Sequence, residues 1–320
     1  MKVYVTRPII ETGIELLKSK NIEVEINPEN KLLSKEELKA KFSAGYDGIL
    51  VLLTDKIDAD IINNSSSNLK IIANYAVGFD NVDVAAATER KIFVTNTPGV
   101  LTEAVAEHAF ALLVSVVKRI VEADKFVREG QYLRWEPKGF LGPQITGKII
   151  GIAGLGRIGT MVARIAKNGF KMDVIYFDVK RNEQFEREFN AGFKELDQLL
   201  SQADFVSIHV PLLPETKHLI NEQRLKLMKP SAILINTSRG PVIDEAALVE
   251  ALKQKTILGA GLDVFENEPK LTLGLIELPN VVLTPHTASA TNEARAAMSR
   301  LAAENIIATL SGQTPPNLVK

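Results

Sequence analysis

Cysteine is absent from the 320-residue sequence. Disulfide bonds, thiolate metal ligands and a cysteine nucleophile are therefore excluded. Histidine is scarce as well, with four residues in the chain, three of which lie dispersed along it. No metal-ligand cluster is visible in this pattern, so we expect no bound metal.

An excess of charge of one sign is also missing. Lys and Arg number 38 against 39 Asp and Glu, a net charge of -1. No basic surplus exists to attract nucleic acid or anionic lipid, which favours a small molecule as the partner. The apolar run 109–117 stops at Lys118, well short of the ~20 residues that span a bilayer. The opening segment 1–8 breaks at Pro8 before a signal-peptide core develops, so we expect a cytoplasmic protein without a membrane partner.

The chain has ample material for packed cores, with 46% hydrophobic and 24% charged residues. Its length favours two domains over one. Short β-branched runs alternate with helix-like segments, a rhythm typical of parallel sheets with helices on both faces. The first series of expected strands is 3–6, 24–26, 48–53, 71–74 and 92–95, and the second is 148–153, 174–177, 205–209, 232–236, 259–263 and 281–284.

Three helical segments stand out between and after these strands. Ser34 and Glu37 form a capping box at a helix start. The segment 102–128 has helical composition throughout and is apolar on every side around 109–117. A helix of this kind is buried all round, so we expect a spine between domains or part of a subunit interface. A final helix is expected at 292–310.

A glycine-rich turn lies between the strand-like run 149–153 and a helical stretch. Its three glycines have separate tasks in a dinucleotide-binding fingerprint. Gly154 allows the tight turn, Gly156 lets the backbone approach a pyrophosphate, and Gly159 lets helix and strand pack closely. The pyrophosphate then binds free N–H groups at the start of the helix.

Asp178 follows the next strand and lies 19 residues beyond Gly159 (178 − 159 = 19). A carboxylate at this distance binds the ribose hydroxyls of NAD and repels a 2′-phosphate. Lys180 and Arg181 come directly after it and offer such a phosphate a counter-charge. We therefore predict NAD as the cofactor and NADP as the weaker alternative.

Three residues near expected strand ends match the needs of 2-keto acid reduction, which requires a cation, a proton donor and a partner for that donor. Arg239 can hold a carboxylate with two parallel hydrogen bonds. Histidine titrates near neutral pH, and His286 follows an expected strand. Glu268 is the candidate partner. Taken singly, the same residues also fit a surface cation, a structural histidine and an ordinary Glu-Pro loop.

Five segments together resemble the D-2-hydroxyacid dehydrogenases. These segments appear in the family's order with similar spacing, and the resemblance covers essentially the whole chain. They are 74–83, 154–159, 236–240, 262–269 and 284–286. The segment 135–147 looks most like the branch of glyoxylate/hydroxypyruvate reductases and 2-ketogluconate reductases.

This resemblance implies two doubly wound α/β domains, a Rossmann NAD-binding domain and a flavodoxin-like substrate domain, with the active site in the cleft between them. The substrate domain would comprise 1–99 and 287–320, because the final helix crosses back to complete it, and the NAD-binding domain 100–286. The implied activity is D-stereospecific hydride transfer between NAD(H) and a small 2-keto or 2-hydroxy acid. A homodimer built partly on the helix 102–128 is also implied.

The resemblance also assigns residue roles. Arg239 would orient the substrate, His286 would donate the proton, and Glu268 would pair with His286. Backbone N–H groups at Val77 and Gly78 would bind the substrate carboxylate. Leu52 would line the substrate pocket, with Leu53 and Trp135 as further apolar surface. The cofactor contacts would come from Gly154, Gly156, Arg157, Ile158 and Gly159 at the pyrophosphate, Asp178 at the ribose, Val210 and Pro211 on the adenine side, and Thr237 and Asp263 near the nicotinamide, with His209, Thr216 and Ser238 as further cofactor-binding residues.

Three alternatives remain. Formate dehydrogenases of the family pair the histidine with Gln. This sequence has Glu268 at that position, which argues against a formate dehydrogenase. Phosphoglycerate dehydrogenases of the family carry an Arg at the position of Leu52, and many have a C-terminal regulatory domain that we do not expect here. Some relatives are NAD-responsive transcriptional corepressors that keep the same three residues. We consider recruitment the weaker hypothesis, because no disordered flank or basic arm accompanies the compact chain.

Overall fold

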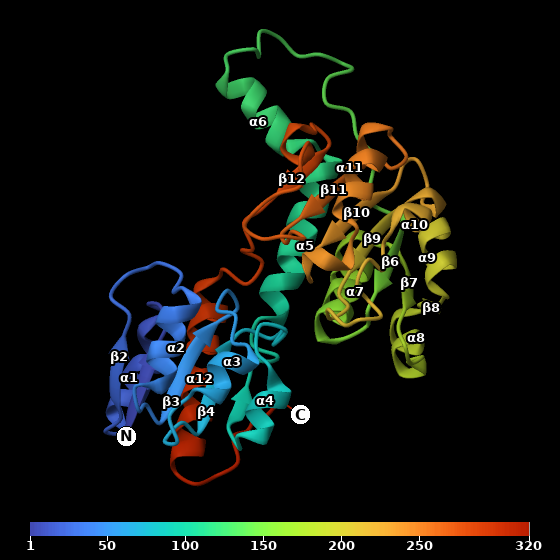
Figure 1. The fold of residues 1–320 in the computed structure, drawn as a ribbon. Coiled ribbons are helices and arrows are strands. Elements are labelled where there is room, and N and C mark those ends of the chain that lie inside the picture. Colours follow the sequence, from blue (N-terminus) through green and yellow to red (C-terminus); the bar gives the residue numbers. More distant parts are fainter. Residues whose placement is uncertain (320) are drawn as a thin grey trace. The chain divides into compact units, whose positions relative to one another are not determined.

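The computed structural model describes residues 1–319. The chain folds into two compact units, each described below by itself (Figure 1). Unit 1 consists of Met1–Leu101 together with the segment from Ala290 onward, and unit 2 of Thr102–Ser289. The sequence predicted divisions at 99 and 286, two to three residues away. Among the described residues no helix is long and apolar enough to cross a membrane.

Unit 1 is built on a five-stranded parallel sheet. Its strand order is β2-β1-β3-β4-β5, the flavodoxin-like order. Strand β2 is therefore added on one side of the neighbouring pair β1 and β3, and strands β4 and β5 are added on the other side. This order confirms the predicted doubly wound sheet. The strands are β1 (Lys2–Val5), β2 (Glu23–Ile26), β3 (Gly48–Leu52), β4 (Ile71–Tyr75) and β5 (Phe93–Thr95).

Five helices complete unit 1, and the last of them comes from the end of the chain. They are α1 (Glu11–Ser19), α2 (Lys35–Ser43), α3 (Ala59–Asn63), α4 (Val84–Glu89) and α12 (Asn292–Leu310). The capping box at Ser34 and Glu37 is present, as predicted. α12 packs on α1 and β4. Ser299 accepts a hydrogen bond from the N–H of Gly13 and donates one to the carbonyl of Ile10, which fixes α12 against α1.

Unit 2 is built on a seven-stranded parallel sheet of order β12-β11-β10-β9-β6-β7-β8. Its switch point lies between β6 and β9, because successive strands extend outward from there on either side. The short edge strand β8 was not predicted from the sequence, since its two residues carry no pattern. The strands are β6 (Ile149–Ala153), β7 (Asp173–Phe177), β8 (Gly192–Phe193), β9 (Phe205–Ile208), β10 (Ile233–Asn236), β11 (Gly259–Leu262) and β12 (Val281–Leu283).

Helices cover both faces of this sheet and enclose two apolar clusters. One cluster is formed mainly by α9 and α11 against the sheet, and the other by α5, α7 and α8. The helices of unit 2 are α5 (Thr102–Val117), α6 (Ile120–Arg128), α7 (Arg157–Phe170), α8 (Glu183–Phe189), α9 (Leu196–Gln202), α10 (Glu222–Leu227) and α11 (Glu245–Lys253), with the short 3₁₀ turns η1 (Gly240–Val242) and η2 (Leu275–Glu277).

The expected single helix over 102–128 is wrong in one respect. Arg119 adopts a left-handed backbone conformation (φ 51°) and divides the segment into α5 and α6. α5 packs on α7, β10 and β11 of its own unit. The predicted burial on every side is wrong for this chain, because Glu103, Glu107 and Ala111 form an exposed stripe along the helix. α6, by contrast, has no buried residue and projects away from the sheet of unit 2 together with the segment that follows it (Figure 1).

Candidate active site

The glycine-rich turn joins β6 to α7 at the switch point of the unit 2 sheet. Gly154 has a φ of +99°, and a Cβ there would lie 2.7 Å from the carbonyl carbon of His209. A Cβ on Gly159 would lie 2.1 Å from the carbonyl oxygen of Gly154. A Cβ on Gly156 would meet nothing within 4 Å. Two glycines therefore serve packing within the protein, and Gly156 leaves open space above the turn.

The start of α7 faces this open space without a side-chain cap. Its N-cap residue is Gly156, which offers no side chain to the first N–H groups of the helix. Arg157 is exposed and Ile158 is partly buried. Uncapped N–H groups and the helix dipole favour a bound anion. With the room left by Gly156, this arrangement fits the pyrophosphate of a dinucleotide.

Asp178 follows β7 and lies against the same turn. One of its carboxylate oxygens accepts a hydrogen bond of 2.6 Å from the backbone N–H of Leu155. The other faces the N–H of Lys180 at 3.4 Å. The carboxylate is therefore fixed beside the fingerprint and remains partly exposed, as a ribose-binding group must be.

Across the switch point, the segment after β9 contains His209, Val210 and Pro211. His209 bonds to Ser207 through Nε2 at 2.8 Å, and burial lowers its pKa to about 3, so the ring is neutral at neutral pH. Val210 is buried and Pro211 is exposed. The hydroxyl of Thr216 donates to the carbonyl of Pro211, which closes a turn. These residues form a wall beside the fingerprint, with Thr216 positioned to shape the loop.

Arg239 follows β10 at the carboxyl edge of the same sheet. The side chain of Asn236 fixes this segment, because its amide donates to the carbonyl of Arg239 and its oxygen accepts from Ser238. The hydroxyl of Thr237 is buried and has no hydrogen-bond partner among the described residues. Gly240 is required by packing, since a Cβ there would lie 1.9 Å from the carbonyl carbon of Phe265.

His286 follows β12, two strands along the same edge, and is paired with Glu268. Its Nδ1 lies 2.9 Å from one oxygen of Glu268, and the other oxygen accepts from the backbone N–H of Phe265. Both side chains retain some exposure, 25% for His286 and 29% for Glu268. The pair is thus oriented by the protein and accessible to a small ligand.

Asp263 has no exposed surface and serves the backbone around His286. Its carboxylate accepts hydrogen bonds from Thr284, Thr287 and Ala288. Its own carbonyl accepts the N–H of His286. These contacts support the left-handed conformation of His286 (φ 53°), an uncommon one for a residue other than glycine.

His108 on α5 completes this cluster and was not identified from the sequence as functional. Its Nε2 lies 2.9 Å from the hydroxyl of Thr284 and 3.3 Å from the carboxylate of Asp263. Burial opposes the charge of Asp263, but the hydrogen bonds from His108 and its neighbours outweigh it and lower the carboxyl pKa. A polar residue within an apolar helix was the signal for His108, yet its partners lie more than 150 residues away along the chain.

Comparison with known proteins agrees with this geometry. Residues 110–288 match the family model for the NAD-binding domain of D-isomer specific 2-hydroxyacid dehydrogenases. A curated glyoxylate reductase from Pyrococcus furiosus is 50% identical, covering 99% of this chain and 95% of its own length. The chain belongs to the D-isomer specific 2-hydroxyacid dehydrogenase family. It is an NAD-dependent dehydrogenase.

Solved structures support the same assignment. A protein from Thermus thermophilus superimposes with a TM-score of 0.93 at 42% identity, covering 100% of both chains. An NADPH-dependent glyoxylate/hydroxypyruvate reductase from Sinorhizobium meliloti, solved with NADP and malonate, gives 0.86 at 34% identity, covering 99% of this chain and 96% of its own.

In this 2-hydroxyacid dehydrogenase, the predicted pocket residue Trp135 is 75% exposed in unit 2, after α6. The other predicted site residues lie in unit 1. The loop after β4 contains Val77 and Gly78, whose carbonyl oxygens accept from the side chains of Asn96 and Asn74 at 2.7 and 2.9 Å. The described residues provide no acceptor for the N–H groups of Val77 and Gly78. The two asparagines therefore orient this peptide segment and leave its donors available.

Leu52 ends β3 and is connected to the same loop through Asn81. The amide of Asn81 donates to the carbonyls of Leu52 and Asp55 and faces Asn74. The N–H of Leu52 donates to the buried carboxylate of Asp55, which also accepts from Thr6. Neither Asn74 nor Asn81 was assigned a role from the sequence, although both lie in the segment that resembles the family.

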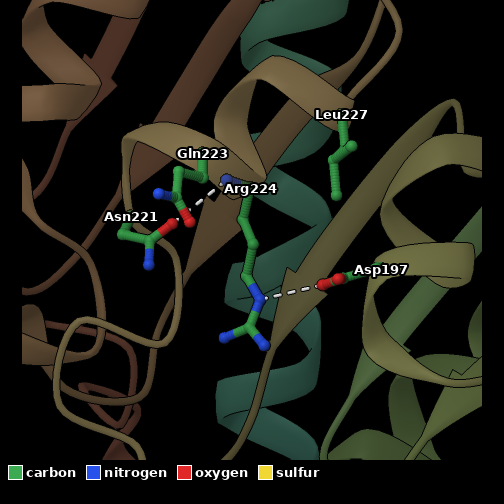
Figure 2. A pocket seen from close by; sticks show the side chains of 5 residues that line it. All are labelled: Asp197, Asn221, Gln223, Arg224 and Leu227. Atoms are coloured by element: carbon green, nitrogen blue, oxygen red, sulfur yellow. Dashed lines mark hydrogen bonds and ion pairs between the residues drawn. The ribbon is translucent and has the colours of Figure 1, made fainter.

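A separate surface pocket between α9 and α10 contains none of these residues (Figure 2). Its Arg224 binds Asp197 at 2.9 Å and the carbonyl of Leu219 at 2.8 Å. Asn221 caps α10 by accepting the N–H of Arg224 (Figure 2). The polar side chains of Asp197, Asn221 and Arg224 are thus engaged in contacts within unit 2. No group of three or more metal-ligating side chains occurs among the described residues.

Proposed function

We propose that this enzyme reduces small, uncharged-tail 2-keto acids such as glyoxylate and hydroxypyruvate with NADH, yielding D-2-hydroxy acids where the product is chiral. The observation that carries the proposal is the pair of His286 and Glu268, 2.9 Å apart and partly exposed at the carboxyl edge of the dinucleotide-binding sheet. The curated relatives named glyoxylate reductase support the substrate class. 2-Ketogluconate is a further candidate.

NAD supplies or accepts a hydride at its nicotinamide ring. We propose that the uncapped start of α7, with Arg157 and Ile158, holds the pyrophosphate and that Asp178 binds the adenosine ribose hydroxyls. Thr237 has a buried hydroxyl without a partner among the described residues, which suits a contact with the nicotinamide amide. His209, Val210 and Pro211 would border the adenine side, and Ser238 and Thr216 would shape the neighbouring loops.

The role of Asp263 is better described as positioning. Its carboxylate is fully buried and already accepts hydrogen bonds from three residues of the segment after β12. A direct contact with the nicotinamide would compete with these bonds. Asp263 would instead hold His286 in place, aided by His108.

We propose that His286 donates the proton to the carbonyl oxygen as the hydride arrives. The carboxylate of Glu268 fixes the ring through Nδ1, which leaves Nε2 to carry the transferred proton. Arg239 would bind the substrate carboxylate and keto oxygen with two parallel hydrogen bonds. The free N–H groups of Val77 and Gly78 would also bind the carboxylate.

Purified protein tests this proposal directly. NADH oxidation should be measured at micromolar enzyme with glyoxylate, hydroxypyruvate, 2-ketogluconate and 3-phosphohydroxypyruvate, and repeated with NADPH. We expect turnover of the first two substrates and a higher kcat/KM with NADH. Absence of turnover with every 2-keto acid would contradict the proposed reaction.

We also propose a homodimer in which α6 and the following segment to Gly142, here called the arm, contact a second copy. Arm residues are strongly exposed although apolar, including Leu133 (88%), Trp135 (75%) and Leu141 (67%). Phe126 packs edge-on against Phe140 at the base of the arm. An ordered apolar surface of this kind marks an interaction site, and most soluble oligomers are homo-oligomers.

Light scattering tests the assembly. The wild type should have about twice the 35.1 kDa mass of one chain. Leu133→Glu with Trp135→Glu should shift it toward the monomer. Val179→Glu is the control, because Val179 is 99% exposed on the loop after β7 and lies outside the arm. A wild-type monomer at micromolar concentration would overturn the dimer. The cytoplasmic location stays a prediction from the sequence.

A further inference from the structure

Arg181 lies three residues beyond Asp178, on the loop where a 2′-phosphate would need a counter-charge. Its side chain is 60% exposed, yet it is engaged. Its Nε and Nη2 donate to the two oxygens of Glu186 at 2.8 and 2.7 Å. One of the two guanidinium edges that can hold a phosphate with parallel hydrogen bonds is therefore occupied by a carboxylate of its own unit, and the charge of Glu186 offsets that of Arg181.

Glu186 is itself held from a second side. The hydroxyl of the buried Tyr176 on β7 donates to it at 2.8 Å and accepts the N–H of Asn182 at 2.7 Å. The Glu186 side chain is only 16% exposed. The hydrogen bond from Arg181, followed by that from Tyr176 and against the effect of burial, lowers its pKa to about 2, so Glu186 is ionised at neutral pH.

We propose that Glu186 is a specificity-determining residue that withholds Arg181 from a 2′-phosphate and thereby strengthens the preference for NADH over NADPH. The inference rests on the proposed placing of the adenosine ribose at Asp178. Asp178 repels the phosphate directly, and Glu186 acts by occupying a cation that the phosphate would otherwise recruit. Lys180 remains exposed and gives the residual use of NADPH.

Glu186→Gln tests the proposal because it removes the charge and keeps the size of the side chain. The variant should release Arg181 to bind the 2′-phosphate. Because exposed ion pairs are weak, we expect only an approximately two- to fivefold gain in affinity for NADPH and in kcat/KM with NADPH. Affinity for NADH should stay within about twofold of wild type. Calorimetry with 2′,5′-ADP and 5′-AMP gives a readout independent of catalysis, and only the 2′-phosphorylated ligand should bind more tightly.

Two further variants separate release of Arg181 from a general loss of negative charge. Glu183→Gln is the matched control, because Glu183 lies on the same helix and faces Arg187 at 3.7 Å instead. It should change 2′,5′-ADP affinity less than Glu186→Gln. Adding Arg181→Gln to Glu186→Gln should abolish the gain.

Three outcomes would overturn the proposal. They are unchanged 2′,5′-ADP affinity in a folded Glu186→Gln variant, an equal gain with Glu183→Gln, and a gain that survives loss of Arg181. Failure of the proposed function would look different, since none of the 2-keto acids tested would then support NADH oxidation by the wild type. The placing of the ribose at Asp178 would instead be rejected if the wild type bound 5′-AMP weakly and Asp178→Ala left that affinity unchanged.

Discussion

Nδ1 of His286 and a carboxylate oxygen of Glu268 lie 2.9 Å apart on segments that follow two neighbouring strands, β12 and β11. Glu268 is fixed in turn by the N–H of Phe265. A second His–Glu pair, His218 with Glu266 at 2.6 Å, involves the same loop after β11. One protein thus provides a proposed catalytic pair and a chemically matched control.

His286→Gln should lower kcat by at least ~10² and leave NADH binding nearly intact, because Gln keeps a hydrogen bond but transfers no proton at neutral pH. Steady-state kinetics and NADH titration measure the two effects. His218→Gln is the control and should keep kcat within a few-fold of wild type. Near-wild-type turnover by His286→Gln would contradict the assigned proton donor.

Arg239→Ala should raise KM and lower kcat together, with kcat/KM falling by about 10² or more, because two charge-assisted hydrogen bonds are lost. Arg239→Lys should recover part of the affinity through its charge and little of the rate, since it lacks the planar fork. Arg224→Ala, in the pocket of Figure 2, should leave both constants unchanged. An unaltered KM in Arg239→Ala would argue against substrate binding by Arg239.

Two glycine variants of the fingerprint should separate folding from cofactor binding. Gly156→Ala meets nothing within 4 Å and has an allowed backbone (φ -73°), so the Tm should hold while NADH affinity falls by roughly tenfold or more. Gly159→Ala clashes with the carbonyl of Gly154 and should lower the Tm by roughly 2–10 °C. Calorimetric melting and NADH titration distinguish them. Full NADH affinity in Gly156→Ala would refute the pyrophosphate site.

Asp263→Asn should destabilise the protein by about 1–3 kcal/mol, because one side-chain atom can no longer accept a hydrogen bond. Burial opposes the charge, but hydrogen bonds led by that from His108 lower the Asp263 pKa. A lowered folded-state pKa adds stability above the unfolded-state value, about 3.9, and this stability is lost as pH falls through the folded-state pKa. The Tm difference between wild type and variant should therefore be largest above about pH 5 and shrink below about pH 4. A pH-independent difference would show that the charge contributes nothing.

Leu52→Arg should improve kcat/KM for 3-phosphohydroxypyruvate at the expense of glyoxylate. An apolar residue cannot compensate the desolvation of a phosphate, whereas a guanidinium can. Kinetics on both substrates measure the switch. Leu32→Arg serves as the control, because Leu32 is exposed in the same unit and has no assigned role in the pocket. Efficient turnover of the phosphorylated substrate by wild type would refute this pocket and leave the reaction class unaffected.

Local patterns in the sequence predicted much of this protein. The fingerprint 154–159 was identifiable because its glycines stand at a fixed spacing between a strand and a helix, and Asp178 because a strand and helix have nearly fixed lengths. The two parallel sheets followed from the alternation of strands and helices. Family resemblance added the pairing of Glu268 with His286, which no local rule supplies.

Other features depend on residues that meet only after folding. His108 contacts Asp263 and Thr284 through packing of α5 on the sheet, and Glu186 meets Arg181 and Tyr176 where α8 returns to β7. The break between α5 and α6 at Arg119 also escaped prediction, because the bidentate bond to Glu122 and the contact with Phe140 hold a backbone that arginine rarely adopts. The sequence predicted the fold through short-range sterics and spacing, and it proposed the reacting groups through resemblance to the family. Tertiary structure decided which charged groups are held by neighbours and which remain free for a ligand, since that depends on distances between remote segments.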